Sequence, residues 1–134
     1  MLHVFDDEVE IHGHKTTREV VLHPGASAIV PVTGDGEILF VRQYRYAVEQ
    51  PLLEIPAGKL EPGEDPVTGA LRELREETGA VPGQLLPMGV YLGSPGCLGE
   101  ELHLFLARDL QMAEAQPDED EFLEMARVPF EEMV

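Results

Sequence analysis

The chain has 134 residues, which suits one domain with a hydrophobic core and is too short for two. Its 26 acidic and 9 basic residues give a formal net charge of −17. Because a surface this acidic repels phosphate backbones and anionic membranes, we expect neither a nucleic-acid polymer nor a membrane as a partner.

The sequence also indicates a compartment. Cys97 is the single cysteine, which excludes an internal disulfide and fits a reducing environment. No apolar run approaches the roughly 18 residues of a membrane span. The N-terminus lacks the basic start and apolar core of a signal peptide. We therefore expect the protein to be cytoplasmic.

Residues 1–22 are predicted to form a β-hairpin that turns at His12-Gly13-His14-Lys15. We interpret the two histidines beside the turn glycine as exposed polar residues rather than metal ligands. The hairpin has few core residues and would be marginally stable alone. We expect it to pack on the main domain or to pair with a second subunit.

Segments 25–32 and 37–42 are apolar and β-branched, and the turn signal at 33–36 between them predicts a central hairpin. The second segment continues into a stretch with two arginines and two tyrosines. One interpretation is an edge strand whose arginine heads reach water. The other is a diphosphate clamp, since an arginine fork matches phosphate oxygens and tyrosine rings stack on bases. We favour the clamp for Arg45, with Tyr44 beside it.

After a short predicted strand at 50–56, the sequence predicts a helix over 66–78. Asp65 is the expected N-cap, Pro66 takes the first position, where its missing N–H costs nothing, and Gly79 suits a left-handed C-cap. Residues at helical spacing predict one buried stripe along this helix. They are Val67, Ala70, Leu71, Leu74 and Thr78.

Three glutamates, Glu73, Glu76 and Glu77, fall on one arc beside that stripe. Like charges one turn apart destabilise a helix by about 0.2–0.5 kcal/mol. Arg72 and Arg75 offset part of this repulsion, but helix geometry places neither in the middle of the arc. Clustered carboxylate oxygens on a rigid element are what a hard divalent cation needs. On spacing alone, a metal site and a solvated acidic face are both open interpretations.

Beyond the helix, strands are predicted at 84–92, 101–107 and 123–128. Residues 93–100 form a long, flexible loop without core residues, which favours a ligand-facing role. A helix begins at Phe130 and stops almost at once, either because the chain is a fragment lacking its terminal helix or because the sequence ends there. Strands, one helix and then strands indicate a mixed α+β fold.

One spacing connects Gly58, Glu64 and the run RELREETGA at 72–80: five residues separate the glycine from the glutamate, and seven separate the glutamate from the run. The pattern resembles the signature of the Nudix hydrolases at every fixed position except the last. There Ala80 replaces the usual aliphatic residue, a departure that touches packing rather than chemistry. On this pattern the chain is identified as a member of that family.

The resemblance implies a fold and a class of reaction. The fold is a Nudix-type α/β/α sandwich with a mixed central sheet, here a single domain over residues 1–134 with the N-terminal hairpin. The reaction is the divalent-metal hydrolysis of a nucleoside diphosphate linked to another group. Mg²⁺ fits best, with Mn²⁺ as a possible substitute, because the signature contains no histidine or cysteine to favour zinc.

Carried over by position, the resemblance also implies roles for single residues. Arg72 orients the carboxylates as a catalytic partner, and Glu76 is either a metal ligand or a close catalytic neighbour. Glu64 acts indirectly or on a further ion. The implied metal-binding set is the carbonyl of Ala57 with Glu64, Glu73, Glu76 and Glu77.

Features outside the signature resemble the ADP-ribose pyrophosphatase branch, which releases AMP and ribose 5-phosphate. They are Ser94-Pro95-Gly96, the segment Arg18-Glu19-Val20 before His23-Pro24-Gly25-Ala26, and the strand end Gln43-Tyr44-Arg45. The analogy implies a substrate-binding set of Arg18, Tyr44, Arg45, Pro95 and Glu100. It also implies that Glu119 or Glu121 supplies a catalytic carboxylate from a late acidic loop, and the sequence does not choose between the two.

Members of that branch are generally homodimers whose N-terminal strands cross, so we expect a homodimer in which Arg18 reaches the other subunit's site. Two alternatives are kept. One is a Nudix hydrolase acting on another nucleoside diphosphate sugar, such as GDP-mannose, or on a dinucleotide. The other is a non-catalytic nucleotide-binding regulator, against which the intact set of signature glutamates argues.

Overall fold

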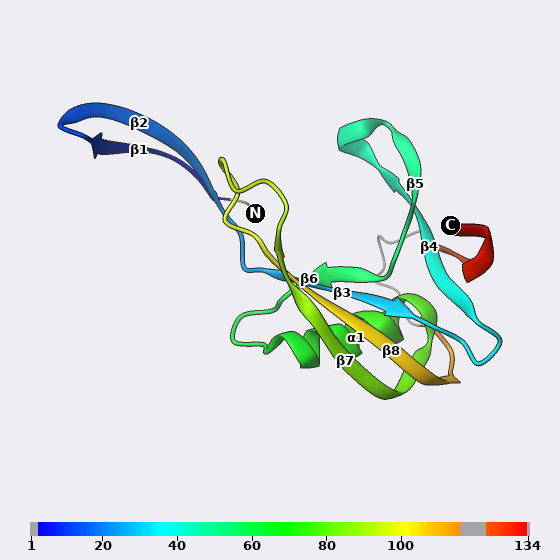
Figure 1. The fold of residues 1–134 in the computed structure, drawn as a ribbon. Coiled ribbons are helices and arrows are strands. Elements are labelled where there is room, and N and C mark those ends of the chain that lie inside the picture. The colour runs from blue at the N-terminus through cyan, green and yellow to red at the C-terminus, as the bar shows by residue number, and fades with distance from the viewer. Residues whose placement is uncertain (1–2, 116–122, 134) are drawn as a thin grey trace.

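The centre of the fold is a mixed four-stranded sheet with the order β6-β3-β8-β7 (Figure 1). The computed structural model describes residues 3–115 and 123–133. Strand β3 (Ala26–Pro31) runs parallel to β8 (Glu101–Met112), whereas β6 (Ala57–Lys59) and β7 (Ala80–Leu92) are antiparallel to their neighbours. The predicted α+β class and mixed sheet are confirmed.

A second sheet, of order β5-β4-β9, stands beside the first. It contains β4 (Glu37–Arg45), β5 (Gln50–Glu54) and β9 (Glu124–Pro129), with the short 3₁₀ helices η1 (Tyr46–Val48) and η2 (Phe130–Met133) at its ends. The predicted central hairpin is therefore wrong, because β3 and β4 lie in different sheets and share one isolated bridge, Val32 with Ile38. Both edges of β3 are already taken, by β6 and by β8.

Helix α1 (Pro66–Thr78) has the predicted bounds, and its caps explain them. The Asp65 carboxylate accepts hydrogen bonds from the backbone N–H groups of Val67 and Thr68, each at 3.1 Å. Gly79 has a left-handed φ of 74° and its N–H donates to the Arg75 carbonyl, at 2.9 Å. Both ends of the helix thus satisfy backbone groups that the helix itself leaves unpaired.

The predicted buried stripe of α1 is only partly correct. Leu74 is fully buried, with Ala70 and Thr78, but Val67 and Leu71 are 47% and 40% exposed. Two glutamates take the place of these aliphatic residues: Glu73 and Glu77 are 8% and 6% exposed. The helix packs on β3, β6 and β7 through a face that contains carboxylates as well as apolar residues. The apolar core beneath it consists of Ile29, Leu39, Ala70, Leu74, Ala80, Phe105 and Ala107.

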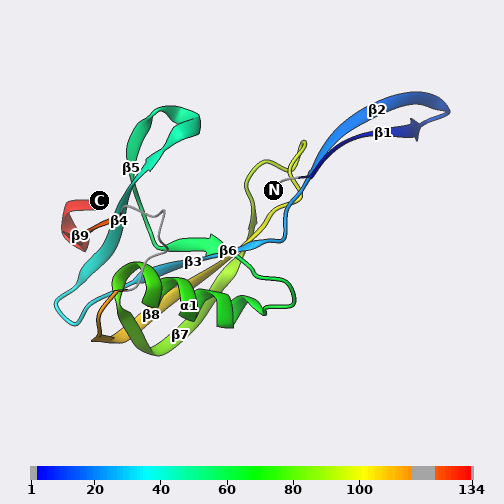
Figure 2. The same cartoon turned by 180° about the vertical axis from the view of Figure 1, so that it is seen from behind.

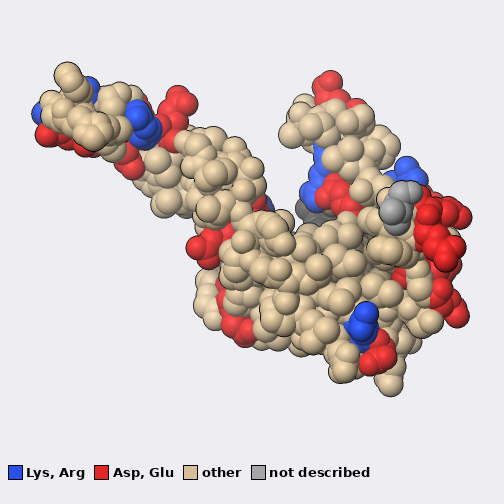
Figure 3. Space-filling view, viewed as in Figure 1, with Lys and Arg blue, Asp and Glu red and all other residues tan. Residues whose placement is uncertain are grey.

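Helix α1 covers one face of the central sheet, as the view from behind shows (Figure 2). In the described residues no second α-helix covers the opposite face, which is largely uncharged (Figure 3). Only one of the two helical layers of the expected sandwich is therefore present in this part of the chain. None of the described helices is long and apolar enough to cross a membrane.

The predicted N-terminal hairpin is confirmed and stands away from the body of the molecule (Figure 1). Its strands β1 (His3–Ile11) and β2 (His14–Leu22) pair in a continuous antiparallel register. At its base, Val21 donates to the Cys97 carbonyl at 2.7 Å and accepts from Gly99 at 3.0 Å. Val4 and Phe5 are 68% and 44% exposed, so the hairpin does not bury its apolar residues on its own domain.

We expect Leu74→Ala to lower the free energy of unfolding by about 2–5 kcal/mol, because it opens a cavity in the core. Leu71→Ala makes the same substitution one turn earlier at a 40% exposed position, and should cost much less. Urea unfolding of both variants measures the difference. Equal losses would contradict the burial pattern of α1.

Candidate active site

A cleft of about 670 Å³ opens where β6, the middle of α1, the end of β4 and the start of β8 meet. In the space-filling view a hollow with charged side chains on its wall lies between the N-terminal hairpin and the β4–β5 hairpin (Figure 3). The residues lining the cleft are His23, Ala26, Gln43, Arg45, Ala57, Gly58, Lys59, Glu61, Arg72, Glu73, Glu100 and Leu102.

The glutamates of α1 dock on the backbone of β6. A Cβ atom at Gly58 would overlap the carboxylate of Glu73, so this position requires glycine for space rather than for its backbone angles. One turn along the helix, the Glu77 carboxylate accepts a hydrogen bond from the Ala57 N–H at 3.2 Å. These two contacts explain why carboxylates lie on the buried face of the helix.

Arg72 lies among the carboxylates, contrary to the expectation from helix geometry. Its guanidinium donates two hydrogen bonds to Glu64, at 2.9 and 3.0 Å, and single bonds to Glu73, at 2.6 Å, and Glu76, at 3.0 Å. A fifth bond, of 3.0 Å, reaches the Lys59 carbonyl on β6. Arg72 therefore joins the loop before the helix, the helix and β6 into one charged network.

This network favours the charged forms of Arg72 and Glu64. The hydrogen bond from Arg72 is the largest cause that lowers the pKa of Glu64. The same contact, followed by those to Glu73, raises the pKa of Arg72. Both shifts favour the charged forms, so the pair remains ionised across the neutral pH range.

The donor set at this edge of the cleft fits a hard divalent cation. Glu73, Glu76, Glu77 and the Ala57 carbonyl offer only oxygen atoms, and the space at Gly58 lets helix carboxylates approach the β6 backbone. Within residues 3–115 and 123–133, no group of three or more His, Cys, Asp or Glu side chains is already arranged around an ion position. The carboxylates turn instead toward Arg72 and the Ala57 N–H.

Arg45 lines the cleft, and Glu54 on the neighbouring strand holds it. Its Nε and Nη2 atoms donate to the two carboxylate oxygens of Glu54, each at 2.8 Å. The hydrogen bond from Arg45 is the main cause that lowers the pKa of Glu54. The role of Arg45 in a diphosphate clamp stays a prediction. Two N–H groups of its guanidinium already donate to the Glu54 carboxylate. Tyr44 is 57% exposed and is not among the residues lining the cleft.

The other predicted site residues are dispersed. Glu100 lines the cleft, but Pro95 lies in an exposed turn of the preceding loop and is not part of its wall. Arg18 lies on β2, where it donates to the Thr17 carbonyl, and does not reach the cleft of its own chain. Glu119 and Glu121 lie outside the described residues. The roles of all these residues stay predictions.

The loop of residues 93–100 is tied down rather than free. The N–H groups of Cys97 and Leu98 both donate to the Ser94 carbonyl, at 3.2 and 2.9 Å. The loop also pairs with β2 through Val21. These bonds hold the backbone that carries Glu100 against the cleft, whereas the sequence suggested a flexible loop.

The cleft wall contains four polar residues to which the sequence predictions gave no role, His23, Gln43, Lys59 and Glu61. A signal existed for Gln43, because it lies two positions before Arg45 on a strand, and such residues share a face. Lys59 directly follows the glycine of the signature. His23 opens the segment 23–26 that resembles the ADP-ribose pyrophosphatase branch, but that resemblance gave the histidine no role of its own.

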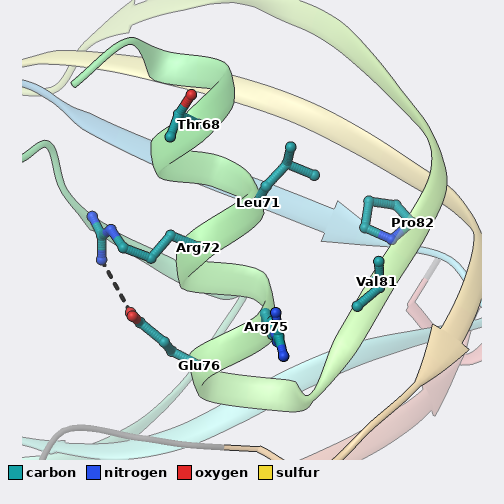
Figure 4. A pocket seen from close by; sticks show the side chains of 7 residues that line it. All are labelled: Thr68, Leu71, Arg72, Arg75, Glu76, Val81 and Pro82. Carbon is teal, nitrogen blue, oxygen red and sulfur yellow. Dashed lines mark hydrogen bonds and ion pairs between the residues drawn. The ribbon is translucent and has the colours of Figure 1, made fainter.

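A second pocket, of about 540 Å³, lies on the other side of α1, toward the start of β7. Leu71, Val81 and Pro82 face one another across it, whereas Arg72 and Glu76 extend from the opposite side of the helix (Figure 4). This pocket explains the exposure of Leu71. It lacks Gly58 and the buried glutamates, so the first cleft is the candidate active site.

Known proteins are similar to this chain over most of its length. The NUDIX domain matches residues 21–134. An ADP-ribose pyrophosphatase of Bacillus subtilis (strain 168) is 43% identical over 135 residues, covering 98% of this chain and 73% of that protein. A methanol dehydrogenase activator of Bacillus methanolicus is 44% identical over 129 residues, covering 94% of this chain and 70% of that protein.

Among solved structures, the crystal structure of an ADP compounds hydrolase superposes with a TM-score of 0.80 at 26% sequence identity. The match covers 98% of this chain and 71% of that one. The fold expected from the sequence is therefore confirmed.

We expect Gly58→Ala to reduce turnover by about a hundredfold, since the added Cβ displaces the Glu73 carboxylate and small misplacements at a site have effects of this size. Gly34→Ala is the control, because a Cβ at Gly34 meets nothing within 4 Å. Steady-state rates of both variants test this. Normal turnover in Gly58→Ala would show that the docking of Glu73 is dispensable.

The pair of Arg45 and Glu54 predicts a pH dependence of stability. Because the pKa of Glu54 is lowered from its usual 4.5, its ion pair stabilises the folded state above that pH and is lost as the pH falls below it. The difference in unfolding free energy between wild type and Glu54→Gln should therefore be full at pH 7 and shrink below pH 4.5. Urea titrations from pH 7 to 3 measure it, and a constant difference would contradict the pairing.

Proposed function

The chain belongs to the Nudix family of hydrolases, and we propose that it cleaves the pyrophosphate of ADP-ribose to AMP and ribose 5-phosphate. The observation that carries this proposal is the docking of Glu73 and Glu77 on β6 at the wall of the cleft. The name of the Bacillus subtilis relative, ADP-ribose pyrophosphatase, supports the choice of substrate.

We propose that Mg²⁺, or Mn²⁺ in its place, is held by Glu73, Glu76 and Glu77 with the Ala57 carbonyl. When bound, the cation polarises phosphate oxygens and lowers the pKa of an attacking water. Arg72 orients Glu73 and Glu76 through hydrogen bonds, and Glu64 anchors Arg72 through two more. This arrangement leaves little reorganisation for the moment of reaction.

Substrate binding has to overcome a net charge of −17. Arg45 and Lys59 supply positive charge on the cleft wall, and Glu100 faces the same space. We assign Arg45 to the pyrophosphate and Glu100 to the ribose side or to a water. A late glutamate, Glu119 or Glu121, is the proposed carboxylate that orients or deprotonates the attacking water.

We also propose that the protein is a cytoplasmic homodimer, joined through the N-terminal hairpin. The exposed Val4 and Phe5 on a hairpin that stands away from its domain support this arrangement. In such a dimer Arg18 lies on the crossing element and contributes a cation to the other subunit's cleft. Analytical ultracentrifugation tests the assembly, and a monomer that retains full activity would contradict it.

Hydrolysis of another nucleoside diphosphate sugar or of a dinucleotide is the second candidate. The observation that favours it is the name of the similar solved structure, ADP compounds hydrolase, which covers more substrates than ADP-ribose alone. The two candidates share the site and differ in the group attached to the nucleotide. A regulator without turnover would show binding and no products.

A panel of ADP-ribose, GDP-mannose and dinucleotides with Mg²⁺ tests the proposal, with products identified by mass spectrometry. We expect AMP and ribose 5-phosphate from ADP-ribose as the fastest reaction, abolished by EDTA and restored by Mg²⁺ or Mn²⁺. Glu77→Gln should lower kcat by orders of magnitude with an unchanged fold.

Glu131→Gln, on the exposed η2, is the matched control for Glu77→Gln and should leave kcat unchanged. Faster turnover of a different panel member would replace ADP-ribose as the substrate. Near-wild-type turnover by Glu77→Gln would overturn the metal assignment.

A further inference from the structure

His23 is a buried imidazole on the cleft wall that the signature does not include. It follows β2 directly, and its side chain is 7% exposed. The ring lines both the cleft of about 670 Å³ and an adjoining cavity of about 170 Å³. Because burying a polar ring is costly unless its nitrogens are hydrogen-bonded, the partners of the two ring nitrogens define its role.

The Nδ1 atom of His23 is an acceptor. The backbone N–H of Gly25 donates to it at 3.2 Å. A backbone amide keeps its proton, so Nδ1 must present its lone pair, and the neutral ring carries its proton on Nε2. The Glu100 carboxylate, 3.5 Å from Nδ1, therefore receives no hydrogen from this nitrogen while the Gly25 bond is in place.

The Nε2 atom is a donor that points to no protein group. It has no hydrogen-bond partner among the residues that the structure describes. Within the same residues, no sealed side-chain nitrogen or oxygen lacks a partner, so Nε2 is open to one of the two hollows that the ring lines. The ring thus presents one uncommitted N–H group to the hollow that it faces.

We propose that His23 is a substrate-binding residue whose Nε2–H donates to a phosphate oxygen of the nucleoside diphosphate. This assignment rests on the proposed function and adds a residue to its site. The two arginines of the cleft already donate hydrogen bonds to carboxylates of the protein. Arg45 donates to Glu54, and Arg72 donates to three glutamates. The His23 donor is not committed in this way, so its full strength is available to an anion.

The same geometry excludes a role for Nε2 as a proton acceptor. While Gly25 donates to Nδ1, the Nε2 atom carries the proton of the ring and has no lone pair to accept another. His23 therefore binds and orients, and the proton of the attacking water goes elsewhere. Its loss should appear as weaker nucleotide binding rather than as the loss of a limb in the pH profile.

Two substitutions separate this role from a purely structural one. In His23→Asn the amide oxygen replaces Nδ1, so the bond from Gly25 can be kept while the donor is lost. In His23→Gln the amide nitrogen reaches the former position of Nε2, so the donor can be kept while the acceptor for Gly25 is lost. Circular dichroism of both variants checks that they fold.

Calorimetry with ADP measures the dissociation constant for wild type and both variants, beside ADP-ribose hydrolysis. We expect His23→Asn to weaken ADP binding about ten- to hundredfold, as for other hydrogen bonds to a charged group. KM should rise by a similar factor with little change in kcat. His23→Gln should bind within a few-fold of wild type.

The reverse order, with Asn close to wild type and Gln impaired, would show that His23 only stabilises the turn at Gly25. Equal binding by all three proteins would also overturn the assignment. Wild type that binds ADP through His23 but fails to hydrolyse ADP-ribose would refute the proposed substrate and leave this inference standing. If wild type does not bind ADP at all, the inference is wrong.

Discussion

The site depends on one contact, the close approach of a helix carboxylate to a backbone without a side chain. Glu73 fits against β6 because residue 58 is a glycine. Glu77 accepts a hydrogen bond from the N–H of Ala57, the residue before that glycine. Burying two carboxylates on one helix face is unfavourable without compensating charge or hydrogen bonds. Arg72 supplies that compensation for Glu73, and the Ala57 N–H supplies it for Glu77, so the positions of the helix, of β6 and of the two carboxylates depend on one another.

This arrangement reconciles an acidic protein with an anionic substrate. The chain carries a net charge of −17, yet Arg45, Lys59 and Arg72 all line its cleft. Both arginines are held by glutamates, which fixes their direction and also reduces the positive charge that they offer. A divalent cation and an uncommitted donor such as His23 would supply what the arginines do not. Specific placement, rather than net charge, then determines binding.

Local chemistry made the helix predictable, because Asp65, Pro66 and Gly79 act through neighbours in the sequence. The choice of which helix face is buried was not local. It depends on β6, and the spacing could not show that Glu73 would displace aliphatic residues from the packed face. The pairing of β3 with the distant β8, instead of β4, depends equally on contacts across the chain. The role of His23 could not be predicted from the sequence either. It depends on which ring nitrogen accepts the hydrogen bond from the Gly25 amide.

The most direct measurement is the anomalous signal from crystals soaked with Mn²⁺ and a slowly hydrolysed analogue of ADP-ribose. The account predicts Mn²⁺ between the carboxylates of Glu73 and Glu77 and the analogue's pyrophosphate, beside the Ala57 carbonyl. Crystals in which the analogue occupies the cleft while that helix edge holds only water would contradict it.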